Sequence, residues 1–243
     1  MTGTNTQWLI APYQPSTFFT LKPASATSSG GKSLLLPTPF AIKMALLDAA
    51  LRTQGKNAGA ILFPQIKNLR IAIKLPDVAV VNNTFVKILR PHKSGVKVTG
   101  TGLQTPMGNT IAFREYVSYH GEMALAFQGM SAAELTPLLL NVNYFGKRGG
   151  FFQLTRLPET HRWTDETLAE NGYTLLTQST TEAFNPQGIL QMVDDCGEKM
   201  TFEHADIYSG KKITLGKERI LHHVILPYRL EHSSKSYSYF KRI

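Results

Sequence analysis

With 243 residues, 42% of them hydrophobic, the chain can bury the core of one large domain or two small ones, which excludes a disordered protein. It contains no apolar run long enough to span a bilayer, no secretory-signal pattern and one cysteine, Cys196, so we expect a soluble cytoplasmic protein without disulfides or a cysteine metal site. The formal net charge is +9, and the excess lies in residues 1–114, which carry +11, whereas residues 115–243 carry −2. This asymmetry favours nucleic acid as the partner. An anionic membrane is less favoured, because the cations are spread singly along expected strands and loops.

The first segments are two short apolar stretches followed by a polar loop. Residues 8–12 and 16–21 predict an opening strand or strand pair, and residues 22–33 have loop composition. The loop ends in Gly-Gly-Lys-Ser, which is similar to part of a phosphate-binding loop. The full signature requires a glycine where the chain has Ala26, and a helix does not follow directly, so we exclude a nucleotide hydrolase.

The clearest helix is expected to begin at Thr38 or Pro39, because threonine is a suitable N-cap and proline fits the first helical position. Apolar residues at spacings of four, three and four predict one buried stripe with Lys43 outside it, and Gly55 is expected to end the helix. The residues of the predicted stripe are Phe40, Met44, Leu47 and Leu51.

Period-two patterns follow this helix. Residues 69–75 predict a half-buried strand, and residues 78–81 and 84–89 predict two more strands with a turn at Asn82-Asn83. Residues 113–120 and 123–127 are expected to form a hairpin with each other.

The next segment combines a short helix, a glycine-rich loop and a strand. Ser131 and Glu134 have the spacing of a capping box, and Pro137 is expected to bend or shorten the helix that follows. The loop at residues 144–150 leads into a strand at 151–157.

The order strand, helix, strand, strand, helix, strand over residues 1–157 predicts an α+β, ferredoxin-like domain. The connection between its second and third core strands is far longer than usual, which predicts a projecting hairpin at about residues 79–109. Residues 158–243 are expected to form a small, strand-rich C-terminal domain or extension.

The projecting hairpin is the strongest candidate for nucleic-acid binding. No Asp or Glu occurs between Val78 and Arg114, so its cations can lie against a phosphate backbone. Leu103 and Met107 lie near the expected tip, where apolar side chains could wedge between bases. The basic residues of the segment are Lys87, Arg90, Lys93, Lys97 and Arg114.

A second candidate is the loop that contains Lys147, Arg148 and Gly149. Its glycines permit close backbone approach to an anion, although a helix end followed by a tight turn would use them equally well.

The sequence contains no metal signature and no motif of a common hydrolase or dinucleotide-binding enzyme. We therefore expect no cofactor. A metal-free ribonuclease would need His, Lys or Tyr around a 2′-hydroxyl, and the local pairs suited to this role are His92-Lys93 and Tyr119-His120.

Three segments together resemble CRISPR-associated RAMP proteins. GGKSLLLPTPFAIKMALL (residues 30–47) is similar to their lead-in and first helix. TIAFREYV (110–117), the acid-free insertion before it and YFGKRGGF (144–151) resemble the fifth Cas family, the small subunit that caps the 5′ handle of CRISPR RNA in type I Cascade complexes. The resemblance covers residues 7–157.

The resemblance implies a ferredoxin-like RAMP fold with a thumb hairpin, and a non-catalytic RNA-binding subunit acting in the prokaryotic cytoplasm. Its expected partners are the crRNA 5′ handle, a backbone RAMP subunit, a large subunit and, indirectly, target DNA. It implies RNA contacts near Lys43 in the first helix and in the glycine-rich loop. Lys32, in the basic loop before that helix, is a further candidate for contact with a phosphate backbone. A metal-independent endoribonuclease that processes repeat RNA and a backbone RAMP subunit are the alternatives.

Overall fold

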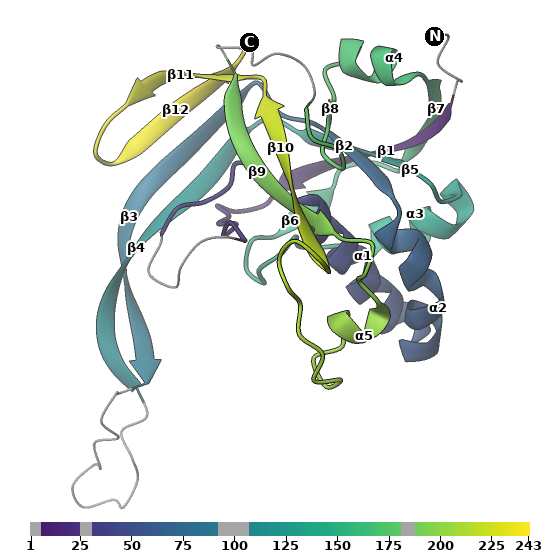
Figure 1. Ribbon diagram of the computed structural model, residues 1–243. Helices are drawn as coiled ribbons and strands as arrows, with labels where there is room; N and C mark the ends of the chain where they lie inside the picture. Colours follow the sequence, from purple (N-terminus) through teal and green to yellow (C-terminus); the bar gives the residue numbers. More distant parts are fainter. Residues whose placement is uncertain (1–5, 25–30, 92–106, 181–187) are drawn as a thin grey trace, which may run out of the picture.

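The computed structural model describes residues 6–24, 31–91, 107–180 and 188–243 (Figure 1). The chain contains both helices and strands, and all paired strands in its sheets are antiparallel, so the fold class is α+β. The helices are α1 (Pro39–Gln54), α2 (Lys56–Lys67), α3 (Ala132–Leu140), α4 (Asp165–Glu170) and α5 (Phe202–Ala205). The strands are β1 (Thr6–Pro15), β2 (Arg70–Lys74), β3 (Val78–Pro91), β4 (Met107–His120), β5 (Met123–Gln128), β6 (Phe152–Leu154), β7 (Glu159–Trp163), β8 (Thr174–Leu175), β9 (Ile189–Cys196), β10 (Arg219–Leu226), β11 (Tyr228–Ser233) and β12 (Tyr237–Arg242).

The largest sheet has the strand order β6-β1-β5-β2-β8, and β7 also pairs with β1. Alternate residues of β1 point to opposite faces, as a strand requires. Leu9 and Tyr13 join the main core with α1, α2 and α3. Trp8 and Ile10 join a second cluster that includes Leu168 of α4. Both faces of the sheet are therefore covered, and neither offers a bare platform for stacking bases.

Two further sheets complete the fold. Strands β9 and β10 form a two-stranded ribbon, and β9 packs against α1. The third sheet has the order β11-β12-β3-β4. Strands β3 and β4 pair from Val78↔His120 to Pro91↔Met107, and Figure 1 shows them running away from the rest of the molecule.

The structure confirms several expected local features. Thr38 caps α1 by accepting a hydrogen bond from the Ala41 backbone N–H, at 3.2 Å. Ser131 and Glu134 form the capping box of α3. The projecting hairpin is present, although β3 runs through Asn82-Asn83 without the expected turn.

The expected hairpin between residues 113–120 and 123–127 is wrong. Strand β4 pairs with β3, whereas β5 pairs with β1 and β2 in another sheet. Gly121, with φ of 103°, separates the two strands. The alternating patterns identified both strands, but their partners depend on distant parts of the chain.

Helix α2, which begins directly after Gly55, was not predicted from the sequence. This glycine has φ of 88° and separates two helices where we expected a helix to give way to a loop. Phe63 and Ile66 of α2 are buried in the main core. The residues from 158 onward contribute to all three sheets, and the division at residue 157 stays a prediction.

The Gly31–Ser33 segment is hydrogen-bonded to β4 at the base of the β3–β4 ribbon. The Gly31 carbonyl accepts a hydrogen bond from the Glu115 backbone N–H at 2.8 Å. In return, the buried Glu115 carboxylate accepts a hydrogen bond from the Ser33 backbone N–H at 2.7 Å and pairs with Lys32 at 2.8 Å. A Cβ on Gly31 would lie 2.3 Å from the Phe113 carbonyl oxygen, so glycine is required for this close approach.

The position of Lys43 differs most clearly from the position expected from the sequence. We expected it outside the buried stripe and in contact with RNA, but its side chain is only 2% exposed. Its ammonium lies 2.6 Å from Asp195 Oδ1, which also accepts a hydrogen bond from the Cys196 backbone N–H. Strand β9 covers this side of α1 and supplies the partner carboxylate, so Lys43 cannot contact RNA in this structure.

We expect Lys43→Met to lower the free energy of unfolding by about 3–5 kcal/mol, because it leaves the Asp195 carboxylate buried without its cation. The double variant Lys43→Met/Asp195→Leu should recover most of this loss, since it removes both charges. Urea denaturation of the two variants and the wild type measures the effect. A single variant within about 1 kcal/mol of wild type would show that the pair does not hold β9 against α1.

We expect Gly31→Ala to lower the free energy of unfolding by about 1–3 kcal/mol, because the new methyl group must displace backbone at Phe113. Lys32→Ala is the neighbouring control. It removes only a largely exposed partner of Glu115 and should cost no more than about 1 kcal/mol. Equal thermal unfolding of the two variants would contradict the tight packing of this segment on β4.

Candidate nucleic-acid interface

The outer part of the β3–β4 ribbon, which we call the thumb ribbon, comprises residues 84–91 and 107–114. Lys87 and Arg90 are exposed on it, and Arg114 is half-buried with its guanidinium donating to the Phe113 carbonyl. Neither segment contains an acidic residue. Lys93, Lys97, Leu103 and His92 lie outside the described residues, as does the side chain of Met107.

Apolar side chains are also exposed on the thumb ribbon. Phe85 is 75% exposed and Ile111 is 67% exposed. Phe85 lies opposite Phe113, with ring centroids 5.6 Å apart, and Lys87 lies opposite Ile111. In β3, Phe85 and Lys87 have the same strand parity as the buried Ala79, so they continue the core-facing side beyond the body of the molecule. The ribbon thus offers cations and uncovered apolar surface together, a combination that suits single-stranded nucleic acid.

These exposed apolar residues were not predicted from the sequence as part of the interface. Phe85, Leu89 and Ile111 read as ordinary apolar strand positions, because their burial depends on what packs over the ribbon. Their position within an acid-free insertion longer than a normal connection is the signal that could have identified them.

A basic rim continues from the base of the thumb ribbon toward α1. Phe19 pairs with Val117 of β4, and Leu21 receives the backbone hydrogen bond of Leu34. These contacts place Lys22 and Lys32, both exposed, on neighbouring segments at the base of the ribbon. Lys22 was recognised only as part of a basic loop.

The glycine-rich loop faces the same region. Lys147, Arg148 and Gly149 are exposed, and contact with Tyr144 raises the pKa of the Arg148 guanidinium further, so it stays charged. Gly146 has φ of 71°, and a Cβ there would lie 3.1 Å from a Leu21 methyl group. The loop therefore packs on the Leu21 segment through a glycine, with Lys147 at its surface.

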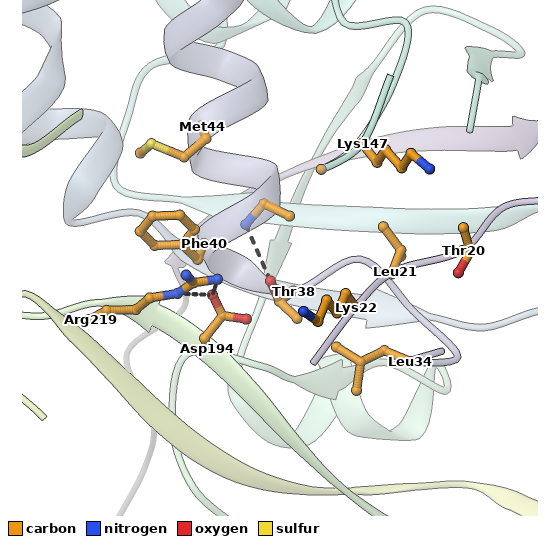
Figure 2. Close-up of a pocket in the computed structure, with 12 residues that line it drawn as sticks. Thr20, Leu21, Lys22, Leu34, Thr38, Phe40, Met44, Lys147, Asp194 and Arg219 are labelled. Atoms are coloured by element: carbon orange, nitrogen blue, oxygen red, sulfur yellow. Dashed lines mark hydrogen bonds and ion pairs between the residues drawn. The ribbon is translucent and has the colours of Figure 1, made fainter. Parts of the chain in front are cut away.

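A cavity of about 390 Å³ lies where these segments meet the start of α1 (Figure 2). Lys22 and Lys147 line it together with Phe40. Asp194 and Arg219, from the β9–β10 ribbon, line it as well. The sequence had no means of assigning these last two residues to the site, because the C-terminal region carries no recognisable motif.

Of the two residue pairs considered for ribonuclease chemistry, His92-Lys93 lies outside the described residues, and Tyr119-His120 does not form a catalytic group. Tyr119 is buried, its hydroxyl donates to the Leu35 carbonyl, and burial raises its pKa well above the ordinary value. His120 is exposed at the end of β4. Tyr119 is thus engaged in the core and unsuited to act as a base.

Two negative findings concern the described residues alone. In these parts of the chain, no three or more His, Cys, Asp or Glu side chains are grouped to hold a metal ion. No helix within them is both long and apolar enough to cross a membrane.

Among curated proteins, the chain is similar to a CRISPR-associated protein. No family model matches the chain. A curated relative, the CRISPR-associated protein Cas5 of Archaeoglobus fulgidus, is 26% identical over 211 residues, which cover 84% of this chain and 86% of the relative.

Two solved structures are similar at lower levels. The crystal structure of a CRISPR protein from Archaeoglobus fulgidus has 10% identity and a TM-score of 0.48, and the alignment covers 98% of this chain and 92% of the other. A chain of a CRISPR RNA-guided surveillance complex has 13% identity and a TM-score of 0.45, covering 92% and 91%. The curated relative, which matches over most of both chains, confirms the resemblance to the fifth Cas family that the sequence motifs indicated.

Proposed function

We propose that this chain is a non-catalytic, RNA-binding subunit of a type I CRISPR surveillance complex of the Cascade kind, and that it holds the 5′ handle of crRNA. The observation that carries the proposal is the acid-free thumb ribbon, which projects from the body with Lys87 and Arg90 exposed. The printed name of the curated relative, Cas5, supports the assignment to a CRISPR system.

The sheet topology supports a ferredoxin-like RAMP fold for the N-terminal part. The strands that correspond to the first to fourth core strands are β1, β2, β5 and β6. They lie in the order fourth, first, third, second, and the long β3–β4 ribbon is inserted between the second and third. We propose the residues from 158 onward as a C-terminal extension of this domain.

The partners follow from the same assignment. We propose crRNA as the direct ligand, a backbone RAMP subunit and a large subunit as neighbours, and target DNA as an indirect partner, in the prokaryotic cytoplasm. The thumb ribbon, Lys32 and the Lys147–Gly149 loop are the proposed RNA contacts. Lys93 and Lys97 of the same insertion are included on the basis of their charge alone.

We expect Lys87→Glu/Arg90→Glu to weaken binding to single-stranded repeat RNA more than tenfold at low salt, because two phosphate contacts become repulsive. The slope of log affinity against log salt should fall by about 1.4, or about 0.7 for each lost contact with a single strand. Fluorescence anisotropy over a salt series measures both quantities.

Lys212→Glu/Lys217→Glu is the matched control. These two lysines are exposed, lie between α5 and β10 and belong to neither the thumb ribbon nor the cavity. The control has the same change in net charge and should alter the affinity less than about threefold. Equal losses in the two variants would overturn the assignment of the thumb ribbon as the RNA contact.

We expect no cleavage when the purified protein is incubated with repeat RNA in the presence of EDTA. Tyr119 is fixed in the core by its hydrogen bond to the Leu35 carbonyl, so its phenol is not accessible to RNA. Gel analysis of the RNA tests the expectation. Defined fragments that vanish in His92→Ala or His120→Ala would establish the endoribonuclease alternative instead.

A further inference from the structure

We propose that the cavity at the start of α1 binds one unstacked nucleotide of the RNA, and that the base it prefers carries an exocyclic amino group. The inference deepens the proposed function and rests on it. It concerns base selection, which the spread cations of the thumb ribbon cannot provide.

The size and walls of the cavity suit a small polar ligand with an aromatic part. Its volume of about 390 Å³ lies within the range of small-molecule sites. Leu21, Leu34, Phe40 and Met44 supply apolar side chains from the loop before α1 and from α1 itself. Single-stranded RNA is commonly recognised by placing a splayed base against such a wall.

A stacked pair of side chains forms part of this wall. The Arg219 guanidinium lies over the Phe40 ring, 4.2 Å from the ring centroid. The guanidinium is fixed in place because its Nε and Nη2 both lie 2.6 Å from Asp194 Oδ2. Aromatic rings and guanidinium planes are the surfaces on which proteins stack unpaired bases.

Asp194 supplies the second feature, a buried acceptor. Its side chain is 3% exposed. Arg219 occupies Oδ2, whereas Oδ1 has no hydrogen-bond partner among the described residues and points away from Arg219 in Figure 2. A carboxylate oxygen accepts a hydrogen bond from an amino group such as N4 of cytosine. Uracil has a carbonyl oxygen at that position, and this oxygen cannot donate a hydrogen bond to the carboxylate.

Cations at the rim supply the third feature. Lys22 and Lys147 are exposed, lie on different segments and form no ion pair with any residue in the described parts of the chain. Ammonium groups beside an apolar cavity are suited to the phosphate of a nucleotide whose base enters it. The cavity therefore combines a stacking surface, an acceptor for an amino group and cations for phosphate.

The first test compares RNA decamers of cytidine and of uridine by fluorescence anisotropy at one salt concentration. We expect the wild type to bind the cytidine decamer at least about fivefold more tightly, as one hydrogen bond to a buried carboxylate allows. Asp194→Asn should abolish the preference. Equal wild-type affinity for the two decamers would overturn the selection of an amino-bearing base.

The second test uses two surface variants that leave the Asp194–Arg219 pair intact. Lys22→Ala/Lys147→Ala should lower affinity for the cytidine decamer about tenfold and reduce the salt slope by about 1.4, whereas Lys212→Ala/Lys217→Ala should change neither appreciably. Equal behaviour of the two variants would overturn the phosphate contacts of the cavity. Binding that depends on Lys87 and Arg90 but not on the cavity residues would leave the proposed function standing, and a wild type that binds neither decamer would overturn both.

Discussion

The ion pair between Lys43 and Asp195 is the constraint on which the arrangement of the site depends. A buried ammonium must have a partner, since leaving one charge uncompensated costs several kcal/mol. The partner lies 152 residues further along the chain, so the pair fixes β9 against α1. Asp194, the neighbour of Asp195, is thereby held beside the start of α1, where Arg219 can stack on Phe40. The cavity wall is therefore a consequence of this pairing.

The β3–β4 ribbon obeys a second constraint. A two-stranded ribbon is marginally stable on its own in water, so its base must be held by other elements. Strand β12 pairs with β3 along one edge. The Gly31–Ser33 segment holds β4 from the other side through the backbone and carboxylate of Glu115. Beyond these supports nothing among the described residues covers the ribbon, which explains how Phe85 and Ile111 stay exposed.

Local chemistry was predictable from the sequence, and tertiary pairing was not. The caps at Thr38 and Ser131 could be predicted, because each cap hydrogen bond involves a residue only three positions away. Lys43 was misassigned because its environment is set by β9, and the hairpin of β4 with β5 was wrong because both strands have partners elsewhere. The positive charge of the thumb ribbon could be predicted from the lack of acidic residues in that part of the sequence. The Asp194 and Arg219 side of the cavity could not, because no short-range pattern connects those residues to α1.

In the proposed function, the two parts of the interface perform different physical tasks. The cations of the thumb ribbon are spread along an extended element, so they attract any phosphate backbone and carry little information about sequence. In the cavity, Arg219 holds the buried Asp194 carboxylate in one orientation, so a wrong base edge there leaves an acceptor without a donor. Affinity then comes mainly from the exposed ribbon. Discrimination comes from the Asp194–Arg219 pair, which strands β9 and β10 place beside the start of α1.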